Sequence, residues 1–407
     1  MKNVSLIKKL AGEEKVPFGR FYRDYRAGRI VILKNRLSLR KAVAVGKGLR
    51  VKVNANIGFS PIASGFRSEL KKLDIAVKYG ADVVMDLSCG KNLRKGLEKV
   101  LRYSRVPVGT VPVYQVFSQH RNPSSADFFQ AVEEQLAMGV DFITVHCGVT
   151  RRALNRLKKH PRLGGVVSRG GALTFGWMEK NGAENPLYED FDLLLKIAKK
   201  YGAVLSLGDG LRPGSIADAN DYLQILELKT LGKLFLRAKK QGVEAMIEGP
   251  GHIPVSQIKR VVDDEKKFCY GAPFYVLGPL VTDAAAGYDH ITSAIGGALA
   301  GSYGTDFLCY VTPAEHLGLP TLNDVKLGVI ASRIAAHAAD VSRGRPASLI
   351  RDNNVSRERF RLNWKGMKKH LLFPEVITST RTKRNVCTMC GKFCPVEQTR
   401  KIIKNRK

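Results

Sequence analysis

The middle of the chain alternates between short runs rich in Val, Ile and Phe and longer stretches with helical periodicity. The short runs end in Gly, Asp, Asn, Ser or His, and the longer stretches close on a glycine, as in SELKKLDIAVKYG and YEDFDLLLKIAKKYG. A strand followed by a helix, repeated about eight times over roughly 260 residues, predicts an α/β fold of the (βα)8 TIM-barrel class. A doubly wound open sheet is the structural alternative, but no Gly-rich dinucleotide fingerprint opens any of these helices.

Nine strand-like runs compete for the eight places of such a barrel. They lie at residues 51–58, 81–88, 109–115, 140–147, 164–170, 203–210, 243–252, 272–279 and 306–313. All of them are short and apolar, so the hydrophobic pattern alone does not identify the run that lies outside the barrel.

The chain has 407 residues and a net charge of +31. Its basic residues are dispersed, as in LNRLKKHPR and KLFLRAKKQG, at spacings that suit the outer faces of helices. No zinc-finger, RNA-recognition or helix-turn-helix pattern accompanies them, so a solvated basic surface is favoured over nucleic-acid binding. No uncharged apolar run reaches the ~18 residues of a membrane span, and no apolar leader opens the chain, so we expect a cytoplasmic protein without a membrane partner.

Three cysteines near the end of the sequence, Cys387, Cys390 and Cys394, form a Cys-x2-Cys-x3-Cys motif. Three thiolates are one too few to close a [4Fe-4S] cluster, so one iron would stay open for an exogenous ligand. A zinc knuckle would need a fourth Cys or His at short spacing, and none follows in residues 395–407. A disulfide is the weakest interpretation, because the seven cysteines are an odd number in a chain without a leader. The spacing favours a cluster over zinc by a small margin.

Polar side chains recur at the predicted carboxyl ends of the strands, where TIM barrels build their active sites. They are Asn56, Met85, Asp86, Tyr114, His146, Ser168, Arg169, Asp209, Arg212, Glu248 and His252. For any one of them a structural hydrogen bond is the more common explanation. The set as a whole predicts a polar site at one rim of the barrel.

Two histidines, His252 in EGPGHIP and His316 in VTPAEHLGLP, each follow a strand end in a loop rich in Gly and Pro. Such loops can present a neutral imidazole rigidly to a metal ion. A lone loop histidine is usually not a ligand, so spacing alone leaves this interpretation in the minority.

Several long motifs resemble the phosphomethylpyrimidine synthase family of thiamine biosynthesis. They include NANIG, GADVVMDLS, PVGTVPVYQ, VVSRGGAL, LSLGDGLRPGSIADANDYLQ, EGPGHIP, APFYVLGPLVTDAAAGYDHITSAIGGALAGSYGTDFLCYVTPAEHLGLP and RIAAHAADVSRG. The resemblance runs from about residue 51 to residue 394 and implies a radical S-adenosylmethionine (SAM) enzyme with a (βα)8 barrel. Such enzymes convert 5-aminoimidazole ribonucleotide to 4-amino-5-hydroxymethyl-2-methylpyrimidine phosphate and release formate and CO. A [4Fe-4S] cluster at the three cysteines, SAM, a low-potential electron donor and a homodimer are implied with it.

The resemblance also implies site residues. The substrate would contact Asn56, Met85, Tyr114, His146, Ser168, Arg169, Gly170, Asp209, Gly210, Leu211, Arg212, Glu248 and Tyr275. Among them Arg169 suits the phosphate, while Asp209 and Glu248 suit the amino and imidazole donors. His252 and His316 would hold one Zn or Fe ion.

The remaining cysteines receive different roles. The thiol of Cys309 could relay a hydrogen atom, against the alternative that it is a small buried hydrophobe. We expect Cys89, Cys147 and Cys269 to be structural.

The chain departs from the family pattern in two ways. Only three residues separate Cys390 from Cys394, where the long bacterial members have four, and the extra N-terminal domain of the long forms is missing.

The short class also contains 5-hydroxybenzimidazole synthase of cobamide biosynthesis, which uses the same substrate and shares nearly every motif. The product therefore stays open at this point, with the pyrimidine phosphate ahead because thiamine synthesis is more widespread. A basic, cluster-bearing nucleic-acid-binding protein is the distant alternative.

These observations predict four parts in the chain: an N-terminal arm at 1–50 that packs on the barrel, the catalytic barrel at 51–320, a helical segment at 321–373, and a mobile iron–sulfur tail at 374–407.

Overall fold

The computed structural model describes residues 2–60, 65–90, 92–377, 382–383, 386–387 and 389–404. The chain separates into two compact units, Met1–Ala339 and Asp340–Lys407. The division falls inside helix α14 (Leu322–Ser342), so the first unit extends beyond the predicted end of the barrel at residue 320. The four-part division itself stays a prediction.

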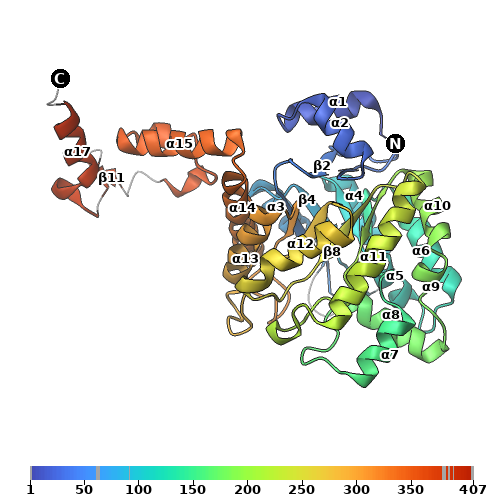
Figure 1. Cartoon of the computed structure of the whole chain (residues 1–407). Coiled ribbons are helices and arrows are strands. Elements are labelled where there is room, and N and C mark those ends of the chain that lie inside the picture. The colour runs from blue at the N-terminus through green and yellow to red at the C-terminus, as the bar shows by residue number, and fades with distance from the viewer. Residues whose placement is uncertain are drawn as a thin grey trace. The chain divides into compact units, whose positions relative to one another are not determined.

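Eight parallel strands close into a barrel in the order β3, β4, β5, β6, β7, β8, β9, β10. Helices surround these strands in Figure 1. Their bounds are β3 (Lys52–Ile57), β4 (Val83–Asp86), β5 (Val108–Thr110), β6 (Phe142–Val145), β7 (Val204–Leu207), β8 (Ala245–Gly249), β9 (Phe274–Leu277) and β10 (Phe307–Cys309). The last strand pairs with the first, with Phe307 opposite Lys52. The predicted (βα)8 fold is confirmed.

The ninth strand candidate, residues 164–170, is not a strand. It belongs to the long connection between β6 and β7, which also contains α7 (Arg151–Lys159), α8 (Arg169–Asn181), α9 (Pro186–Glu189) and α10 (Phe191–Tyr201). Strand β6 already pairs directly with β7, with Phe142 opposite Val204, so the sheet has no place for another strand. The assignment of Ser168 and Arg169 to a strand end is therefore wrong. Ser168 is the N-cap of α8 and accepts a hydrogen bond from the amide of Gly171.

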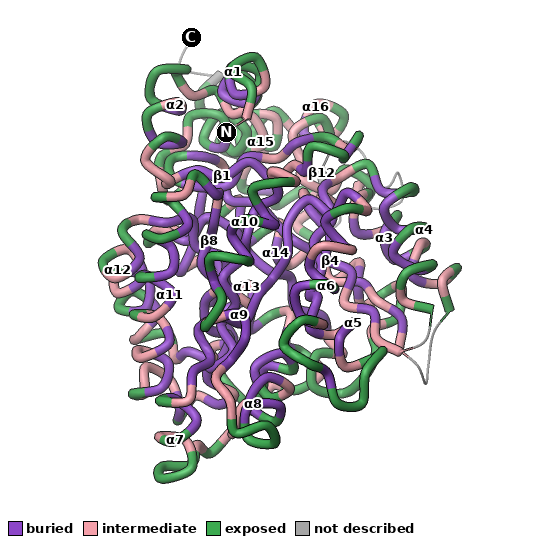
Figure 2. The backbone as a smooth tube through the Cα atoms, turned by 90° about the vertical axis from the view of Figure 1, so that its right-hand side faces the viewer, coloured by how far each residue is buried: buried purple, intermediate pink, exposed green. Residues whose placement is uncertain are grey.

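Helices follow the strands and bury one apolar face each. Besides α10 and α14 they are α3 (Phe66–Lys78), α4 (Leu93–Tyr103), α5 (Pro112–Gln119), α6 (Ser125–Ala137), α11 (Tyr222–Lys240), α12 (Ile258–Phe268) and α13 (Asp289–Tyr303), with short helices η1 (Ile216–Asp218) and η2 (Val255–Gln257). In α10, Leu194 and Leu195 are buried while Lys196 and Lys199 are exposed. Figure 2 shows the same division, with buried strands inside helices that have exposed outer turns. This face of α10 fits the expectation of a solvated basic surface.

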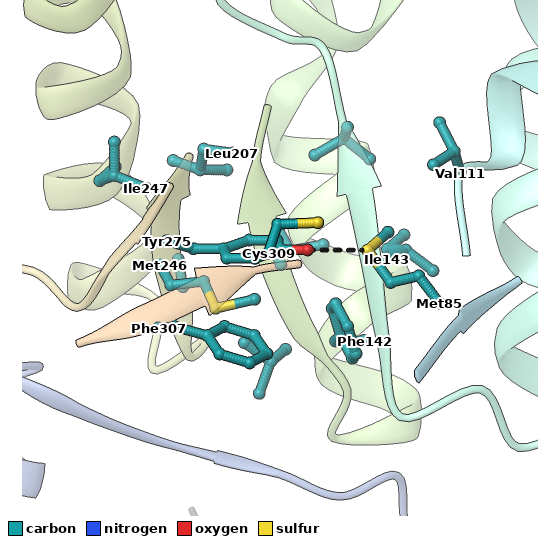
Figure 3. Close-up of a cluster of buried hydrophobic side chains, with 14 of the residues drawn as sticks. Met85, Val111, Phe142, Ile143, Leu207, Met246, Ile247, Tyr275, Phe307 and Cys309 are labelled. Carbon is teal, nitrogen blue, oxygen red and sulfur yellow. Dashed lines mark hydrogen bonds between the residues drawn. The ribbon is translucent and has the colours of Figure 1, made fainter. Parts of the chain in front are cut away.

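Large side chains fill the interior of the barrel below the level of Tyr275 and Cys309. Phe142, Met246 and Phe307 are fully buried there (Figure 3). The ring of Tyr275 stacks on Phe307 with a centroid distance of 4.4 Å. The filled interior confines ligands to the upper end of the barrel.

The N-terminal arm closes the amino end. It consists of α1 (Val4–Glu13), α2 (Phe18–Arg26) and an antiparallel hairpin of β1 (Ile30–Leu33) and β2 (Val43–Gly46). Alternate hairpin residues face two cores: Ile30 and Ile32 pack with the arm helices, and Val31 and Leu33 pack with the barrel. The carboxylate of Glu244, directly before β8, accepts the Ile32 amide at 2.7 Å. In Figure 1 the arm lies at the end opposite α7 and α8.

The second unit contains short elements after the end of α14. They are α15 (Pro346–Phe360), α16 (Trp364–Lys368), η3 (Pro374–Val376), the strand pair β11 (Thr382–Lys383) and β12 (Val386–Cys387), η5 (Gly391–Phe393) and α17 (Pro395–Lys404). In the part of the chain that the structure describes, no helix combines the length and the apolar character needed to cross a membrane.

Candidate active site

A cavity with about 500 Å³ of empty space opens at the carboxyl end of the barrel. Nine of the predicted residues line it: Asn56, Met85, Tyr114, His146, Asp209, Arg212, Glu248, Tyr275 and Cys309. Every strand of the barrel, or the segment that directly follows it, contributes at least one of them. Residues far apart in the sequence thus converge on one site of the size that small-molecule sites usually have.

Asp86, which the strand-end pattern also suggested, does not line this cavity. Successive side chains of a strand point to opposite faces, so Met85 faces into the barrel and Asp86 faces the surrounding helices. There the Asp86 carboxylate accepts hydrogen bonds from both the amide and the hydroxyl of Ser88. Burial raises the pKa of Asp86 to about 6.

The predicted turns at residues 168–170 and 209–212 pack against each other beside the cavity. A Cβ on Gly170 would lie 2.1 Å from Cε1 of His146, and one on Gly171 would lie 2.3 Å from the carbonyl oxygen of Gly210. Only glycine allows this approach, which explains the glycines of both motifs. Of these turns, Asp209 and Arg212 reach the cavity, while Ser168, Gly170, Gly210 and Leu211 support its wall.

Arg169 lies at the rim and is exposed. Its guanidinium carbon sits over the ring of Tyr114, 4.8 Å from the centroid, and its Nη1 donates to Sγ of Cys89 at 3.0 Å. A cation held against an aromatic ring keeps its orientation while it stays free to meet an anion. Cys89, expected to be purely structural, therefore contacts a predicted substrate residue.

Glu248 is held by two hydroxyl groups that the sequence analysis did not identify. Its Oε1 accepts from Thr144 Oγ1 at 2.6 Å and from Ser206 Oγ at 2.9 Å. Burial raises the pKa of Glu248, and the two hydroxyls oppose that shift. Both donors occupy inward positions of β6 and β7, so strand alternation was the signal that could have identified them.

Asp209 and Arg212 form an ion pair at 3.1 Å inside the cavity. Burial raises the pKa of Asp209 to about 8 although Arg212 opposes the shift. Burial, with the charge of Arg212 added, lowers the pKa of His146 to about 3, so its imidazole is neutral near pH 7.

Among the described residues, Asp209 Oδ2, His146 Nδ1 and Asn54 Oδ1 are buried without a hydrogen-bond partner. Asp209 and His146 line the cavity, where a polar ligand could complete their hydrogen bonds.

The thiol of Cys309 lies beside two asparagines. Asn56 Nδ2 donates to its Sγ at 3.2 Å and Asn54 Nδ2 at 3.6 Å. Burial raises the pKa of Cys309 to about 11, so the group keeps its hydrogen at neutral pH. The hydroxyl of Tyr275 donates to Sδ of Met85 at 3.5 Å, the dashed line in Figure 3.

His252 and His316 come together although they are remote from each other in the sequence. Their ring centroids are 5.2 Å apart. Nδ1 of His252 lies 2.8 Å from Asp283 and Nδ1 of His316 lies 3.1 Å from Asp289, which leaves Nε2 of both rings for another partner. Carboxylates orient metal-ligating histidines in this way, so the pair fits a shared Zn or Fe ion. Within the described ranges no group of three protein ligands assembles.

The cluster motif lies in the second unit. Cys390 and Cys394 flank the turn η5, where the Cys394 amide donates to the Gly391 carbonyl at 3.2 Å, and both have free thiols. The side chain of Cys387 lies outside the described residues. Two free thiols one turn apart fit the donor set that an iron–sulfur cluster requires.

The sequence model of the "Radical SAM ThiC family" matches residues 2–401. The chain belongs to this family. The resemblance that the motifs indicated is confirmed, and membership in the radical SAM ThiC family implies SAM and a [4Fe-4S] cluster as cofactors.

Curated relatives agree with the family match. Proteins named phosphomethylpyrimidine synthase from Desulforamulus reducens and Carboxydothermus hydrogenoformans are 52% and 54% identical, each covering 87% of this chain and 85% of their own length. The same name is given to a Thermodesulfovibrio yellowstonii protein, 48% identical over 98% of this chain and 96% of its own. A dihydropteroate synthase structure from Xanthomonas albilineans covers 78% of this chain and 100% of its own, with 12% identity and a TM-score of 0.45. That likeness says nothing about activity.

Proposed function

We propose that this chain is the radical SAM enzyme that converts 5-aminoimidazole ribonucleotide to 4-amino-5-hydroxymethyl-2-methylpyrimidine phosphate, with release of formate and CO. The observation that carries the proposal is the convergence of nine predicted residues on one cavity, in a chain of the radical SAM ThiC family. Relatives about 50% identical over most of the chain carry the name of this activity, which supports the pyrimidine product over 5-hydroxybenzimidazole.

Arg169 and Ser168 bind the substrate phosphate in this proposal. The Arg169 guanidinium is held over Tyr114 and can offer two parallel N–H donors to phosphate oxygens. Ser168 caps α8, whose N-terminal amides add the positive end of a helix dipole. Gly170 lets these groups pack directly on His146.

The base of the nucleotide faces acids and a neutral imidazole. Glu248 accepts a hydrogen bond from the amino group, Asp209 Oδ2 meets the unsubstituted ring nitrogen, to which it can donate the proton that it holds below about pH 8, and His146 Nδ1 supplies a neutral partner. Asn56, Met85 and Tyr275 form the wall next to Cys309. Arg212 keeps Asp209 in place, with Gly210 and Leu211 supporting the turn.

The cofactors are held by the remaining predicted residues. Cys387, Cys390 and Cys394 ligate a [4Fe-4S] cluster, and His252 and His316 hold one Zn or Fe ion. The cluster and SAM, when bound, supply a 5′-deoxyadenosyl radical that abstracts a hydrogen atom from the substrate. Cys309, a buried thiol that keeps its hydrogen, is placed to give or take a hydrogen atom in the same cavity.

A low-potential electron donor, a homodimer and a cytoplasmic location complete the proposal, while nucleic acid and membranes play no part in it. The dispersed basic residues on outer helix faces support a solvated surface over a nucleic-acid site.

An anaerobic turnover assay tests the function. The reconstituted protein receives 5-aminoimidazole ribonucleotide, SAM and a strong reductant, and mass spectrometry identifies the products. We expect the pyrimidine phosphate together with 5′-deoxyadenosine. Formation of 5-hydroxybenzimidazole would move the protein to cobamide synthesis, and neither product from an intact cluster would refute the proposed reaction. Cys309→Ser with a normal product yield would rule out the hydrogen relay.

A further inference from the structure

Arg162 is buried at the centre of a hydrogen-bond network beside the cavity. Its sequence context, LNRLKKHPR, suggests a solvated helix face, yet its side chain is only 2% exposed. Nε and Nη2 donate to the two carboxylate oxygens of Asp221 at 2.7 and 2.5 Å. Nη1 donates to the carbonyl oxygens of Leu211 at 2.7 Å and Arg212 at 3.3 Å. One guanidinium therefore ties the turn at 209–212 to Asp221, the N-cap of α11.

Glu227, on α11, holds the same turn through its amides. Its Oε2 accepts the Leu211 N–H at 2.8 Å, and the side chain is buried. It approaches the turn so closely that a Cβ on Gly210 would lie 3.3 Å from its Oε1. Arg162 thus holds two carbonyl groups of the turn, and Glu227 holds one of its amide groups.

The same network reaches the segment that leads to Ser168. Asp218 accepts the amide of Leu163 at 3.1 Å and that of Gly164 at 2.7 Å. The loop before α8 and the loop after β7 are therefore bound to one another. Neither Arg162 nor Glu227 lines the cavity, so both act through the residues that do.

We propose that Arg162 and Glu227 are positioning residues that hold the backbone of residues 209–212 from two sides and so set Asp209 and Arg212 for the substrate. This inference rests on the proposed function, because it assigns the turn to the 5-aminoimidazole ribonucleotide site. Four acceptors arranged around one planar guanidinium need the fork geometry of arginine, and the compact ammonium of lysine cannot serve them together.

Calorimetric binding of 5-aminoimidazole ribonucleotide to the full-length protein tests the role, beside steady-state kinetics of the reconstituted enzyme. Arg162→Lys is expected to weaken binding at least 10-fold and to lower kcat/KM about 100-fold, because a displacement near 1 Å at a reacting site has that effect. Glu227→Met, which loses the acceptor, is expected to weaken binding similarly. Glu227→Gln keeps an acceptor of the same shape and should stay within about three-fold of wild type.

Two further variants separate positioning from folding. Arg152→Lys is the matched control, because Arg152 is exposed on α7 and makes a single hydrogen bond to the Tyr222 hydroxyl at 2.9 Å; it should change nothing. Asp221→Asn keeps the N-cap of α11 but removes the charge opposite Arg162. If Arg162→Lys does not fold, Asp221→Asn tests the role in its place, and we expect it to weaken nucleotide binding at least three-fold.

The outcomes are distinct. Wild-type protein that does not bind the nucleotide would overturn the proposed function and this inference with it. The positioning role alone would be overturned by a different result. In that result the wild type binds the nucleotide, and the folded variants Arg162→Lys, Asp221→Asn and Glu227→Met keep its affinity and its kcat/KM while only their melting temperature falls. Loss of affinity in Glu227→Met with rescue in Glu227→Gln would support it.

Discussion

The buried charges of Asp141 and Lys52, at the amino end of the barrel, have ion-pair partners, whereas two buried polar atoms of the cavity at the carboxyl end have no hydrogen-bond partner in the part of the chain that the structure describes. At the amino end, the carboxylate of Asp141 is fully buried and accepts hydrogen bonds from Arg40 Nε at 2.8 Å and from the Val108 amide at 2.9 Å. Lys52, 2% exposed, pairs with Glu14 at 2.8 Å. At the carboxyl end, Asp209 Oδ2 and His146 Nδ1 are buried without a partner among the described residues.

This difference separates stability from recognition along one barrel. A buried charge with its partner present holds the arm against the strands, whereas an unpartnered buried polar atom costs roughly 1–3 kcal/mol of folding free energy. Such a cost is expected where a ligand completes the hydrogen bonds. Substitutions at the amino end are therefore expected to leave ligand binding intact. Substitutions at the carboxyl end are expected to leave the folded state intact.

Breaking a pair at the amino end should have the largest effect on stability. Arg40→Met leaves the buried carboxylate of Asp141 without its cation, and removing one partner of a buried pair costs about 3–5 kcal/mol. We expect that loss in the free energy of unfolding by denaturant titration, with nucleotide affinity unchanged in the folded protein. Arg36→Met, at an exposed neighbouring position, is the control. Weakened nucleotide binding in Arg40→Met would mean that the two ends are coupled.

At the carboxyl end, Asp209→Asn should change the pH dependence of stability. Burial raises the pKa of Asp209 to about 8, so the folded chain holds a proton there that the unfolded chain releases above about pH 4. Its contribution to the free energy of unfolding therefore falls as the pH rises from about 4 to 8, by up to about 1.4 kcal/mol per pH unit, and is constant above that range. In Asp209→Asn this fall should disappear.

Denaturant unfolding of both proteins at pH 5, 6 and 7 measures the difference. The difference between the two profiles reports Asp209 together with its electrostatic coupling to Glu227 and Glu248, which face the same carboxylate. Parallel profiles would show that Arg212 keeps Asp209 ionised, and the contrast between the two ends would then lose its electrostatic basis.

Arg169→Lys should affect recognition without affecting stability. The exposed guanidinium would lose its paired donors to phosphate, and we expect binding of 5-aminoimidazole ribonucleotide to weaken about 10-fold, with the melting temperature unchanged. The nucleoside without phosphate is the matched ligand control, and its affinity should be the same for both proteins. An equal loss for nucleotide and nucleoside would place Arg169 away from the phosphate.

At the histidine pair we expect a change in metal affinity and no change in the stability of the barrel. Asp289→Asn weakens the orientation of His316, and loss of such a carboxylate typically lowers metal affinity about 10- to 100-fold. Zinc titration followed by measurement of bound metal should show that decrease at unchanged melting temperature. His316→Ala should abolish binding at this site, and metal content equal to wild type in both variants would rule out the proposed metal site.

Much of the fold could be predicted because it depends on local order. Strand and helix periods repeat through the chain, and glycine closes the helices, as Gly202 does after α10 with a φ of +61°. Residues at the carboxyl ends of strands share one rim in any such barrel, which is why most predicted cavity residues converge. The motifs, in turn, are long and irregular enough to indicate the family by themselves.

Other features depended on which segments meet. The run at 164–170 has the apolar character of a strand, but β6 and β7 pair directly and exclude it. Arg162 reads as one basic residue among many, and only packing between two loops buries it against Asp221 and two carbonyl groups. No pattern in the sequence identified Asp283 and Asp289 as the partners of the two histidines.

The sequence by itself determined the barrel, the family and the residue types at the rim, since these follow from hydrophobic period, glycine placement and long motifs. The tertiary structure decided which polar atoms lost water without gaining a partner, which charges became buried, and therefore how the pKa values of Asp209 and His146 shift. The physical reason is that desolvation and hydrogen-bond geometry depend on distances between segments remote in the chain, and a one-dimensional pattern does not contain those distances.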